Sequence, residues 1–326
     1  MVRLSDGFGR TFKYLRLSVT EACNFKCSYC LPDGYNKCAG PSPLSLDELR
    51  RAATAFSELG LSKIRLTGGE PTIRKDFDEI AHTIAALPGV DKLALTTNGY
   101  RLRDRAQGWR DAGISAINVS LDSLNPNTFH QVTGHDRCRE VLEGIDAAFD
   151  AGFESVKVNA VYLKGINDQE IDAYLTLAKN RPLSVRFIEL METGDHPDYF
   201  RRHHIAASTI SDKLEHEGWT QKLKAADAGP ANEYVHPDYQ GSIGLIAPYS
   251  KDFCKSCNRL RFSSMGNLHL CLFGNFGVPM RQYLQSDDQI KELKEALWRA
   301  VARKTAGHQL GLGLTGQTSN LSSIGG

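Results

Sequence analysis

The chain has 326 residues, and its 39 Lys and Arg nearly balance its 38 Asp and Glu, which leaves a net charge of +1. Hydrophobic residues make up 41% of it, enough for one large domain, or a domain with an appendage, to bury its own core. The charge balance gives no indication of a nucleic-acid or membrane surface, so any phosphate site must be local. Because no stretch has the apolar length of a membrane span or a signal peptide, we expect a soluble, cytoplasmic protein.

Six short β-rich segments alternate with amphipathic stretches in the N-terminal part of the chain. Such a succession of β-then-α units predicts an α/β fold with a parallel sheet, and favours a curved, barrel-like sheet over a flat one. The expected strands are Tyr14–Val19, Lys63–Thr67, Lys92–Thr96, Ala116–Ser120, Ser155–Ala160 and Ser184–Ile188.

Three helix starts are predicted from an N-cap residue with a Glu three positions later. Ser45 and Glu48 form a capping box, and the pairs that begin at Asp76 and at Asn167 have the same spacing. Gly60 is expected to end the first helix.

Chemically distinctive loops follow the first four predicted strands. These loops hold Cys23 to Cys30, Gly68 to Pro71, Asn98-Gly99 and Asp122-Ser123. Since parallel sheets of this kind work at the carboxyl ends of their strands, we expect the four loops to gather on one face.

The pattern changes after about residue 195. A strand at Ser242–Ile246 and a long helix from Ser286 toward Gly307 are expected there, in a C-terminal layer packed against the barrel. The stretch 306–326 contains six Gly and no Asp, Glu, Lys or Arg, which is typical of a flexible tail. We therefore expect a partial barrel in 1–195, a C-terminal region in 196–305 and a tail in 306–326.

Six of the eight cysteines fall into two groups of three. Cys23, Cys27 and Cys30 are spaced C-x3-C-x2-C, so three thiolates can reach one metal centre and leave a fourth position open. Structural zinc normally has four ligands, and no suitable fourth Cys or His is near, since Cys38 is separated by a Gly/Pro-containing loop. Cys254, Cys257 and Cys271 form the second group, for which a site-differentiated iron cluster is favoured over zinc or redox chemistry. Cys38 and Cys138 have no assigned role and are taken as ordinary thiols.

Arg259 and Arg261 lie between the second and third cysteines of the second group. In an extended chain they project to the same side, where two guanidinium groups suit a polyphosphate. The alternative is a solvated surface strand, and the flanking cysteines favour the anion site.

The C-x3-C-x2-C group with Tyr29 before its last Cys, together with Gly68-Gly-Glu-Pro71, resembles the radical S-adenosylmethionine (SAM) superfamily. From about residue 10 to the end, the chain is similar to the GTP 3',8-cyclase family. The strings that carry this resemblance are Tyr14-Leu-Arg-Leu-Ser-Val-Thr20, Arg65-Leu-Thr-Gly-Gly-Glu-Pro71, Thr96-Thr-Asn-Gly99, Asn118-Val-Ser-Leu-Asp122, Arg186-Phe-Ile-Glu-Leu-Met191 and Cys254 to Arg261. The one mild departure is Leu321, where many relatives have Met ahead of Ile-Gly-Gly.

The resemblance implies an incomplete (β/α)6 TIM-type barrel, usually dimeric, with two 4Fe-4S clusters facing an enclosed cavity. The first cluster would reduce SAM to give a 5'-deoxyadenosyl radical, which takes the 3' hydrogen of GTP so that C3' adds to C8. The second would hold guanine on its open iron. The product would be (8S)-3',8-cyclo-7,8-dihydroguanosine 5'-triphosphate, an early intermediate of molybdenum cofactor biosynthesis.

The resemblance also implies roles for individual residues. Matching SAM contacts are Tyr29, Gly69, Ser120 and Met191, and matching GTP contacts are Arg16, Arg65, Thr96, Lys157, Arg259, Leu260 and Arg261. The terminal Gly325-Gly326 is expected to enter the cavity and act in catalysis. Lys157 could instead be a strand lysine that reaches solvent, and Met191 could belong to the core. Expected partners are a flavodoxin- or ferredoxin-type electron donor, a second copy of the chain and, for hand-over of the product, cyclic pyranopterin monophosphate synthase.

Two other functions remain open from the sequence. A radical SAM enzyme that modifies a peptide would also use an auxiliary cluster, although such relatives usually have longer C-terminal cysteine arrays. A non-catalytic zinc or iron-sulfur module would leave the arginine pair and the loops at the strand ends unexplained.

Overall fold

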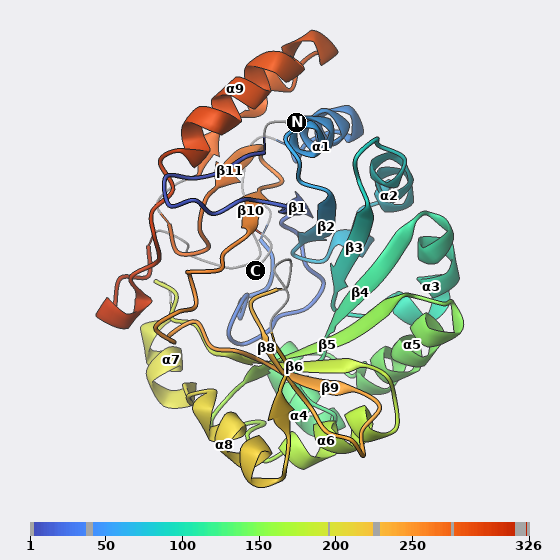
Figure 1. Cartoon of the computed structure of the whole chain (residues 1–326). Helices are drawn as coiled ribbons and strands as arrows, with labels where there is room; N and C mark the ends of the chain where they lie inside the picture. The colour runs from blue at the N-terminus through green and yellow to red at the C-terminus, as the bar shows by residue number, and fades with distance from the viewer. Residues whose placement is uncertain are drawn as a thin grey trace.

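The computed structural model describes residues 3–36, 42–194, 196–223, 229–274, 277–316 and 324. Six parallel strands form the centre of a curved sheet, in the order of the chain (Figure 1). They are β1 (Tyr14–Thr20), β2 (Lys63–Gly68), β3 (Lys92–Thr97), β4 (Ile114–Ser120), β5 (Ser155–Tyr162) and β6 (Ser184–Glu189). Each contains the strand expected from the sequence, and the incomplete barrel is confirmed.

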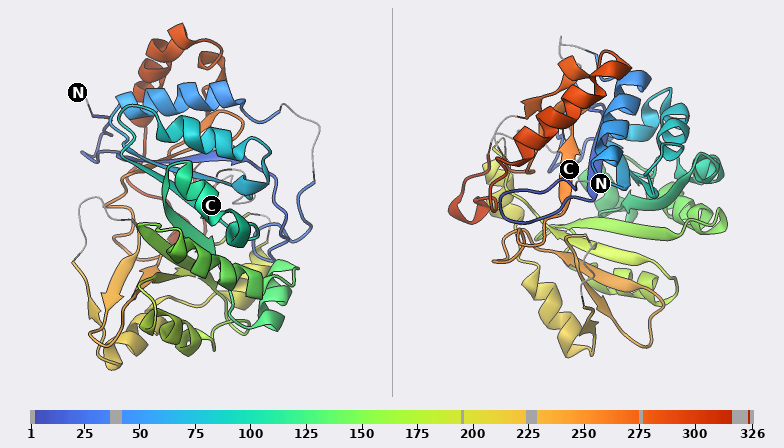
Figure 2. Two further views of the ribbon diagram at one scale, coloured as in Figure 1. Left: turned by 90° about the vertical axis from the view of Figure 1, so that its right-hand side faces the viewer. Right: turned by 45° about the horizontal axis from the view of Figure 1, so that its top comes forward.

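Helices cover the outer face of this sheet (Figures 1 and 2). Between the strands lie α1 (Leu46–Glu58), α2 (Phe77–Ala85), α3 (Leu102–Asp111), α4 (Pro126–Thr133), α5 (Cys138–Asp150) and α6 (Ile171–Lys179), with a short 3-10 turn η1 (Pro71–Ile73) after β2. The core lies between the two layers, where strand residues such as Leu15, Ile64 and Leu95 are fully buried against helix residues such as Phe56 and Ile80.

The C-terminal region extends the same sheet at both edges, in addition to packing against it. β9 (Ser242–Ile246) pairs parallel with β6, and β10 (Arg259–Phe262) pairs parallel with β1. Antiparallel strands then complete each edge: β8 (Asn232–Val235) and β7 (Thr220–Gln221) beyond β9, and β11 (Asn267–His269) and β12 (Val278–Pro279) beyond β10. The sequence predicted β9 with its observed bounds but placed it in a separate layer.

The remaining helices lie at the two ends of the sheet. α7 (Pro197–His203) and α8 (Ser208–His216) follow β6, while η2 (Arg281–Tyr283), η3 (Asp287–Gln289) and α9 (Ile290–Val301) follow β12. α9 packs beside α1. In the part of the chain that the structure describes, no helix combines the length and apolarity needed to cross a membrane.

Part of the expected tail has defined structure. A 3-10 turn, η4 (Leu310–Leu312), is closed by a bridge between Gln309 and Leu314, and Leu310 is buried. Ile324 is also buried, whereas Gly325 and Gly326 lie outside the described residues.

Of the three predicted N-caps, only that of α1 forms as expected. Asp76 precedes α2 but pairs with the Arg74 guanidinium at 2.8 Å instead of capping the helix. Asn167 lies before α6, which begins later, at Ile171. The Asn167 side chain accepts from the Leu163 N–H and donates to the carbonyls of Asp122 and Val161. Both side chains thus bind other nearby groups in place of the backbone N–H groups of a helix N-terminus.

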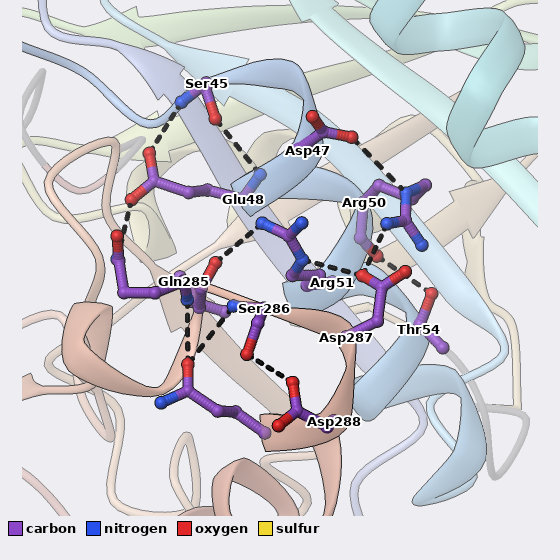
Figure 3. A network of polar contacts seen from close by, with 12 residues as sticks. Ser45, Asp47, Glu48, Arg50, Arg51, Thr54, Gln285, Ser286, Asp287 and Asp288 are labelled. Atoms are coloured by element: carbon purple, nitrogen blue, oxygen red, sulfur yellow. Dashed lines mark hydrogen bonds and ion pairs between the residues drawn. The ribbon is translucent and has the colours of Figure 1, made fainter.

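The α1 N-terminus is bound to the C-terminal region by a polar network (Figure 3). The Ser45 hydroxyl accepts from the Glu48 N–H at 3.2 Å, and the Glu48 carboxylate accepts from the Ser45 N–H at 2.8 Å. That carboxylate also accepts from Arg281 and Gln285, while Asp287 pairs with Arg50 and Arg51. The network fixes the η2–η3 segment against the first barrel helix.

Ser45→Ala is expected to lower the free energy of unfolding by about 1 kcal/mol, because it removes the acceptor of the capping box. Ser208→Ala is the matched control, since Ser208 is exposed at the start of α8 and α8 has no side-chain cap. Equal denaturation midpoints for the two variants would show that the capping box contributes no stability.

Candidate active site

One cavity of about 570 Å³ brings together the loops that follow the parallel strands. Cysteines from both groups line it, as do side chains of β1 to β6 and β10. Among the predicted site residues, those on the cavity wall are Arg16, Tyr29, Arg65, Gly69, Thr96, Ser120, Lys157, Met191, Arg259, Arg261 and all six cysteines. The expectation that these loops gather on one face is confirmed.

The first cysteine loop is held in a compact turn. The Cys27 carbonyl accepts from the N–H groups of Cys30 and Leu31, both at 2.9 Å. Next to it, Phe25 stacks on His135 with ring centroids 4.7 Å apart, and the Lys26 N–H donates to the Thr133 carbonyl at the end of α4. The backbone therefore presents three half-buried thiols to the cavity without a disulfide.

Gly68 and Gly69 allow the end of β2 to lie directly against this loop. A Cβ at Gly68 would lie 2.2 Å from the Thr20 carbonyl oxygen, and one at Gly69 would lie 2.3 Å from that of Ala22. Gly68 also has a φ of +152°, which L side chains rarely adopt. Only glycine fits at these two positions, so the Gly-Gly pair is more than ordinary turn chemistry.

Glu70 is the buried anchor of this arrangement. Its carboxylate accepts from the hydroxyls of Thr72 and Thr97 and from the N–H groups of Thr72 and Asn98, at 2.6 to 3.1 Å. The Asn98 side chain in turn donates to Asn24 in the cysteine loop at 2.8 Å. Because a fully satisfied buried carboxylate is rigid, Glu70 fixes the ends of β2 and β3 relative to the thiols.

Tyr29 of the cysteine loop is fixed by a hydrogen bond near the ends of β4 and β5. Its hydroxyl donates to Asp122 at 2.9 Å, and the other Asp122 oxygen accepts from the Val161 N–H at 2.8 Å. Burial raises the pKa of Asp122 to about 6, partly offset by these two hydrogen bonds. Tyr29 thus joins the cysteine loop to the ends of β4 and β5, where Ser120 also lines the cavity.

The second cysteine group lies at the β10 end of the cavity. The Cys257 N–H donates to the Cys254 carbonyl at 3.2 Å, and Cys271 follows β11. The Arg10 guanidinium donates to the carbonyls of Cys254 and Ala306, at 3.1 and 2.6 Å. A Cβ at Gly307 would lie 3.3 Å from the Cys254 sulfur, so the chain after α9 packs directly on this thiol.

Three arginines stand side by side on neighbouring strands between the two groups. In the parallel register Arg16 of β1 lies beside Arg261 of β10 on one side and Arg65 of β2 on the other. Burial, with the charges of Arg16 and Arg259, lowers the pKa of Arg261 to about 9. Like charges placed directly beside one another destabilise a sheet, so the arrangement is suited to an anion.

Arg259 and Arg261 share a face as predicted, but the intervening Leu260 does not. Its side chain is fully buried in the core on the opposite face of β10. Because successive residues of a strand alternate between faces, the Leu260 side chain points away from the cavity, and its expected GTP contact stays a prediction. Only its backbone remains available to a ligand.

Two charged residues without a predicted role, Arg186 and Glu233, lie on the cavity wall across from the arginine row. Arg186 of β6 pairs with Glu233 of β8 at 2.9 Å, and the Lys157 ammonium is 3.9 Å from the same carboxylate. Burial and the charge of Arg186 lower the pKa of Lys157 to about 7, against the opposing effect of Glu233. The alternation of Arg186 with buried Val185 and Phe187 was the signal available for Arg186; Glu233 lies in a strand that the sequence did not predict.

Cys138 lies apart from the two thiol groups. It is buried at the start of α5, with its sulfur 3.7 Å from the carbonyl oxygens of Ser123 and Leu124, and it does not line the cavity. Cys38 lies outside the described residues.

Two family models together match most of the chain. Residues 17–178 match the radical SAM superfamily, and residues 183–310 match Molybdenum Cofactor Synthesis C. The models divide the chain just before β6, which belongs to the same sheet as β1 to β5.

Among solved structures, SuiB from Streptococcus suis has a TM-score of 0.59 at 15% identity. The alignment covers 89% of this chain and 68% of SuiB. At this identity the likeness concerns the fold alone, and it does not carry the peptide-modifying alternative.

Curated relatives match over the full length. A GTP 3',8-cyclase from Aeromonas hydrophila is 53% identical over 100% of this chain and 97% of the relative. Those from Stenotrophomonas maltophilia and Yersinia pestis are each 55% identical over 100% of both chains. By this similarity, and by the two cysteine groups that share one cavity, the chain belongs to the GTP 3',8-cyclase family of radical SAM enzymes.

Proposed function

We propose that this chain converts GTP to (8S)-3',8-cyclo-7,8-dihydroguanosine 5'-triphosphate, an early step of molybdenum cofactor biosynthesis. The observation that carries the proposal is the shared cavity, in which two groups of three thiols flank a row of arginines. A non-catalytic metal module would have no use for buried like charges between its metal sites.

The first cysteine group fits a 4Fe-4S cluster that binds SAM, because it offers three thiols to the cavity and no fourth protein ligand in the loop. When bound, the cluster and SAM supply the 5'-deoxyadenosyl radical that removes the 3' hydrogen of GTP. Tyr29, Gly69, Ser120 and Met191 are proposed to hold SAM. The absence of a side chain at Gly69 lets its backbone lie against the cysteine loop, and Glu70 keeps that backbone in place beside the proposed SAM site.

Cys254, Cys257 and Cys271 are proposed to hold a second 4Fe-4S cluster that binds guanine. The donor set fits, since three thiols line the cavity, and the absence of a side chain at Gly307 lets the chain after α9 lie directly against Cys254. Arg259 and Arg261 lie next to this group. A triphosphate that they bind would therefore belong to the same GTP molecule as the guanine at the second cluster.

The triphosphate is proposed to lie along Arg261, Arg16 and Arg65. Planar guanidinium groups bind phosphate oxygens in pairs, and Arg65 and Arg261 are already buried in this wall while Arg16 is partly buried. Thr96 and Lys157 are proposed to contact the rest of GTP. Leu260 would contribute through its backbone.

Further proposals concern the setting of the enzyme. A flavodoxin- or ferredoxin-type donor would supply electrons, two copies of the chain would form a homodimer, and cyclic pyranopterin monophosphate synthase would receive the product. A cytoplasmic location would suit both the donor and the oxygen-sensitive clusters.

Replacing cysteines of the two groups should separate two activities. Cys23→Ala should abolish formation of 5'-deoxyadenosine, whereas Cys254→Ala should retain some SAM cleavage and lose the cyclised product. Anaerobic assays that quantify both products, with iron and sulfide analysis, check this; the unaltered chain should hold about eight of each.

Cys138→Ala is the matched control, because Cys138 is buried away from both groups and should affect neither iron content nor products. Stoichiometric zinc without iron after anaerobic reconstitution, or a normal yield of cyclised product from Cys254→Ala, would contradict the assignment of the two sites.

Arg261→Ala is expected to weaken GTP binding by about tenfold, since a hydrogen bond between charged groups contributes about 1.5 to 3 kcal/mol. Arg261→Lys should restore the affinity only in part, because a lysine cannot bind two oxygens with fixed geometry. Arg303→Ala, an exposed arginine outside the cavity, should bind GTP normally. Equal dissociation constants for Arg261→Ala and Arg303→Ala would exclude Arg261 from the triphosphate site.

The terminal Gly325-Gly326 is proposed to reach the same cavity. The Ile324 carbonyl accepts from the Arg261 guanidinium at 3.3 Å, so the last described residue already lies at the arginine row. Deleting Gly325 and Gly326 should leave both clusters and GTP binding intact but stop 3' hydrogen abstraction. A separate peptide of the last ten or so residues should partly restore it. Full activity of the truncated chain would show the terminus to be a linker.

A further inference from the structure

Tyr14 is the first residue of β1 and has no part in the proposed ligand contacts, yet it lies among them. It is buried in the cavity wall, with Arg259 of β10 beside it on one side and Lys63 of β2 on the other. Its hydroxyl oxygen accepts from Arg65 Nε at 2.6 Å, and the charge of Arg16, two residues along the same face of β1, also acts on it. One oxygen therefore contacts one member of the arginine row and interacts electrostatically with its neighbour.

Cations from four strands surround this hydroxyl, and the Glu233 carboxylate across the cavity is paired with Arg186 at 2.9 Å and lies 3.9 Å from Lys157. Arg16 comes from β1, Lys63 and Arg65 from β2, Arg259 and Arg261 from β10, and Arg186 from β6 across the cavity. Burial by itself would raise the pKa of Tyr14, but the charges of Arg65, Arg16 and Lys63 outweigh it and lower the pKa to about 7. Near neutral pH the hydroxyl is thus divided between its neutral and ionised forms.

We propose that Tyr14 is a positioning residue that aligns Arg16 and Arg65 for the triphosphate and takes up a proton when the triphosphate binds. The inference rests on the proposed GTP site and adds a proton to its binding equilibrium. The proton comes from solvent, the O–H bond forms on the phenolate oxygen, and no bond of the ligand breaks.

The physical reason is competition for the same cations. An ionised Tyr14 satisfies Arg16 and Arg65 internally, so triphosphate oxygens must displace a negative charge. A neutral hydroxyl still accepts from Arg65 Nε, and since Arg65 Nη1 donates to the Leu95 carbonyl at 2.7 Å, Nη2 is the nitrogen through which Arg65 would reach the ligand. Binding therefore favours the protonated form, and affinity must fall as pH rises through the pKa of Tyr14 in the unliganded enzyme.

The test compares the cluster-loaded full chain with its Tyr14→Phe variant by anaerobic calorimetry, with inorganic triphosphate and GTP as probes. At about pH 6 the variant should bind about tenfold more weakly, because Arg65 loses the acceptor that holds its Nε. As pH rises to about 8.5 this difference should shrink or reverse, because only the unaltered chain must protonate a phenolate. Titration of the ligand and of Lys157 is common to both proteins and cancels in the ratio.

Proton uptake gives a second measurement. In two buffers of different ionisation enthalpy, the unaltered chain should take up more protons per triphosphate than Tyr14→Phe near pH 8. Tyr239→Phe is the matched control, since Tyr239 also lies beside a cation, with Lys179 5.6 Å from its ring, but lies outside the cavity. It should behave like the unaltered chain.

A fluorinated tyrosine at position 14 covers the case of a poorly folded Tyr14→Phe. It keeps the ring and hydroxyl but ionises at lower pH, so the fall in affinity should shift to lower pH. Parallel pH profiles and equal proton uptake for the unaltered chain, Tyr14→Phe and the fluorinated chain would overturn the role of Tyr14. Absence of triphosphate binding in the unaltered chain would instead overturn the GTP site itself.

Discussion

The parallel pairing of β10 with β1 is the constraint on which the site depends. Residues 259–262 are paired with residues 14–17, although more than two hundred positions separate them in the chain. This single register places Arg261 beside Arg16, sets Leu260 against the core and carries the second cysteine group into the cavity that holds the first. A shift of the register by one residue would turn both arginines of β10 into the apolar layer.

The two faces of this strand pair have opposite energetic effects. On the helix side, Leu15, Leu17, Leu260 and Phe262 are fully buried, and each contributes roughly 1.5 to 3 kcal/mol. On the cavity side, neighbouring like charges each cost up to about 1 kcal/mol before a ligand arrives. The apolar face therefore outweighs the cationic face, which lets the fold keep a charged wall ready for a polyphosphate.

Local signals in the sequence were enough for the barrel strands, because alternating burial and turn residues are properties of short segments. They were enough for the Ser45 cap as well, but at Asp76 and Asn167 a nearby guanidinium or backbone group competes with the helix N-terminus, and the spacing rule does not decide between them. Pairing of β10 with β1 and of β9 with β6 is a long-range choice, so the extension of the sheet at both edges could not be read from spacing. The Arg186–Glu233 pair and the position of Tyr14 depend on the same long-range pairing. Strand alternation alone could have limited the expected contact of Leu260 to its backbone.

The proposed function requires that a radical generated at the first cysteine group acts on GTP bound along the arginine row. The most direct measurement uses GTP labelled with deuterium at C3', with SAM and a reductant under anaerobic conditions. Deuterium is expected to appear in 5'-deoxyadenosine, together with a cyclised GTP product. Formation of 5'-deoxyadenosine without deuterium, and without change to GTP, would contradict the proposed function.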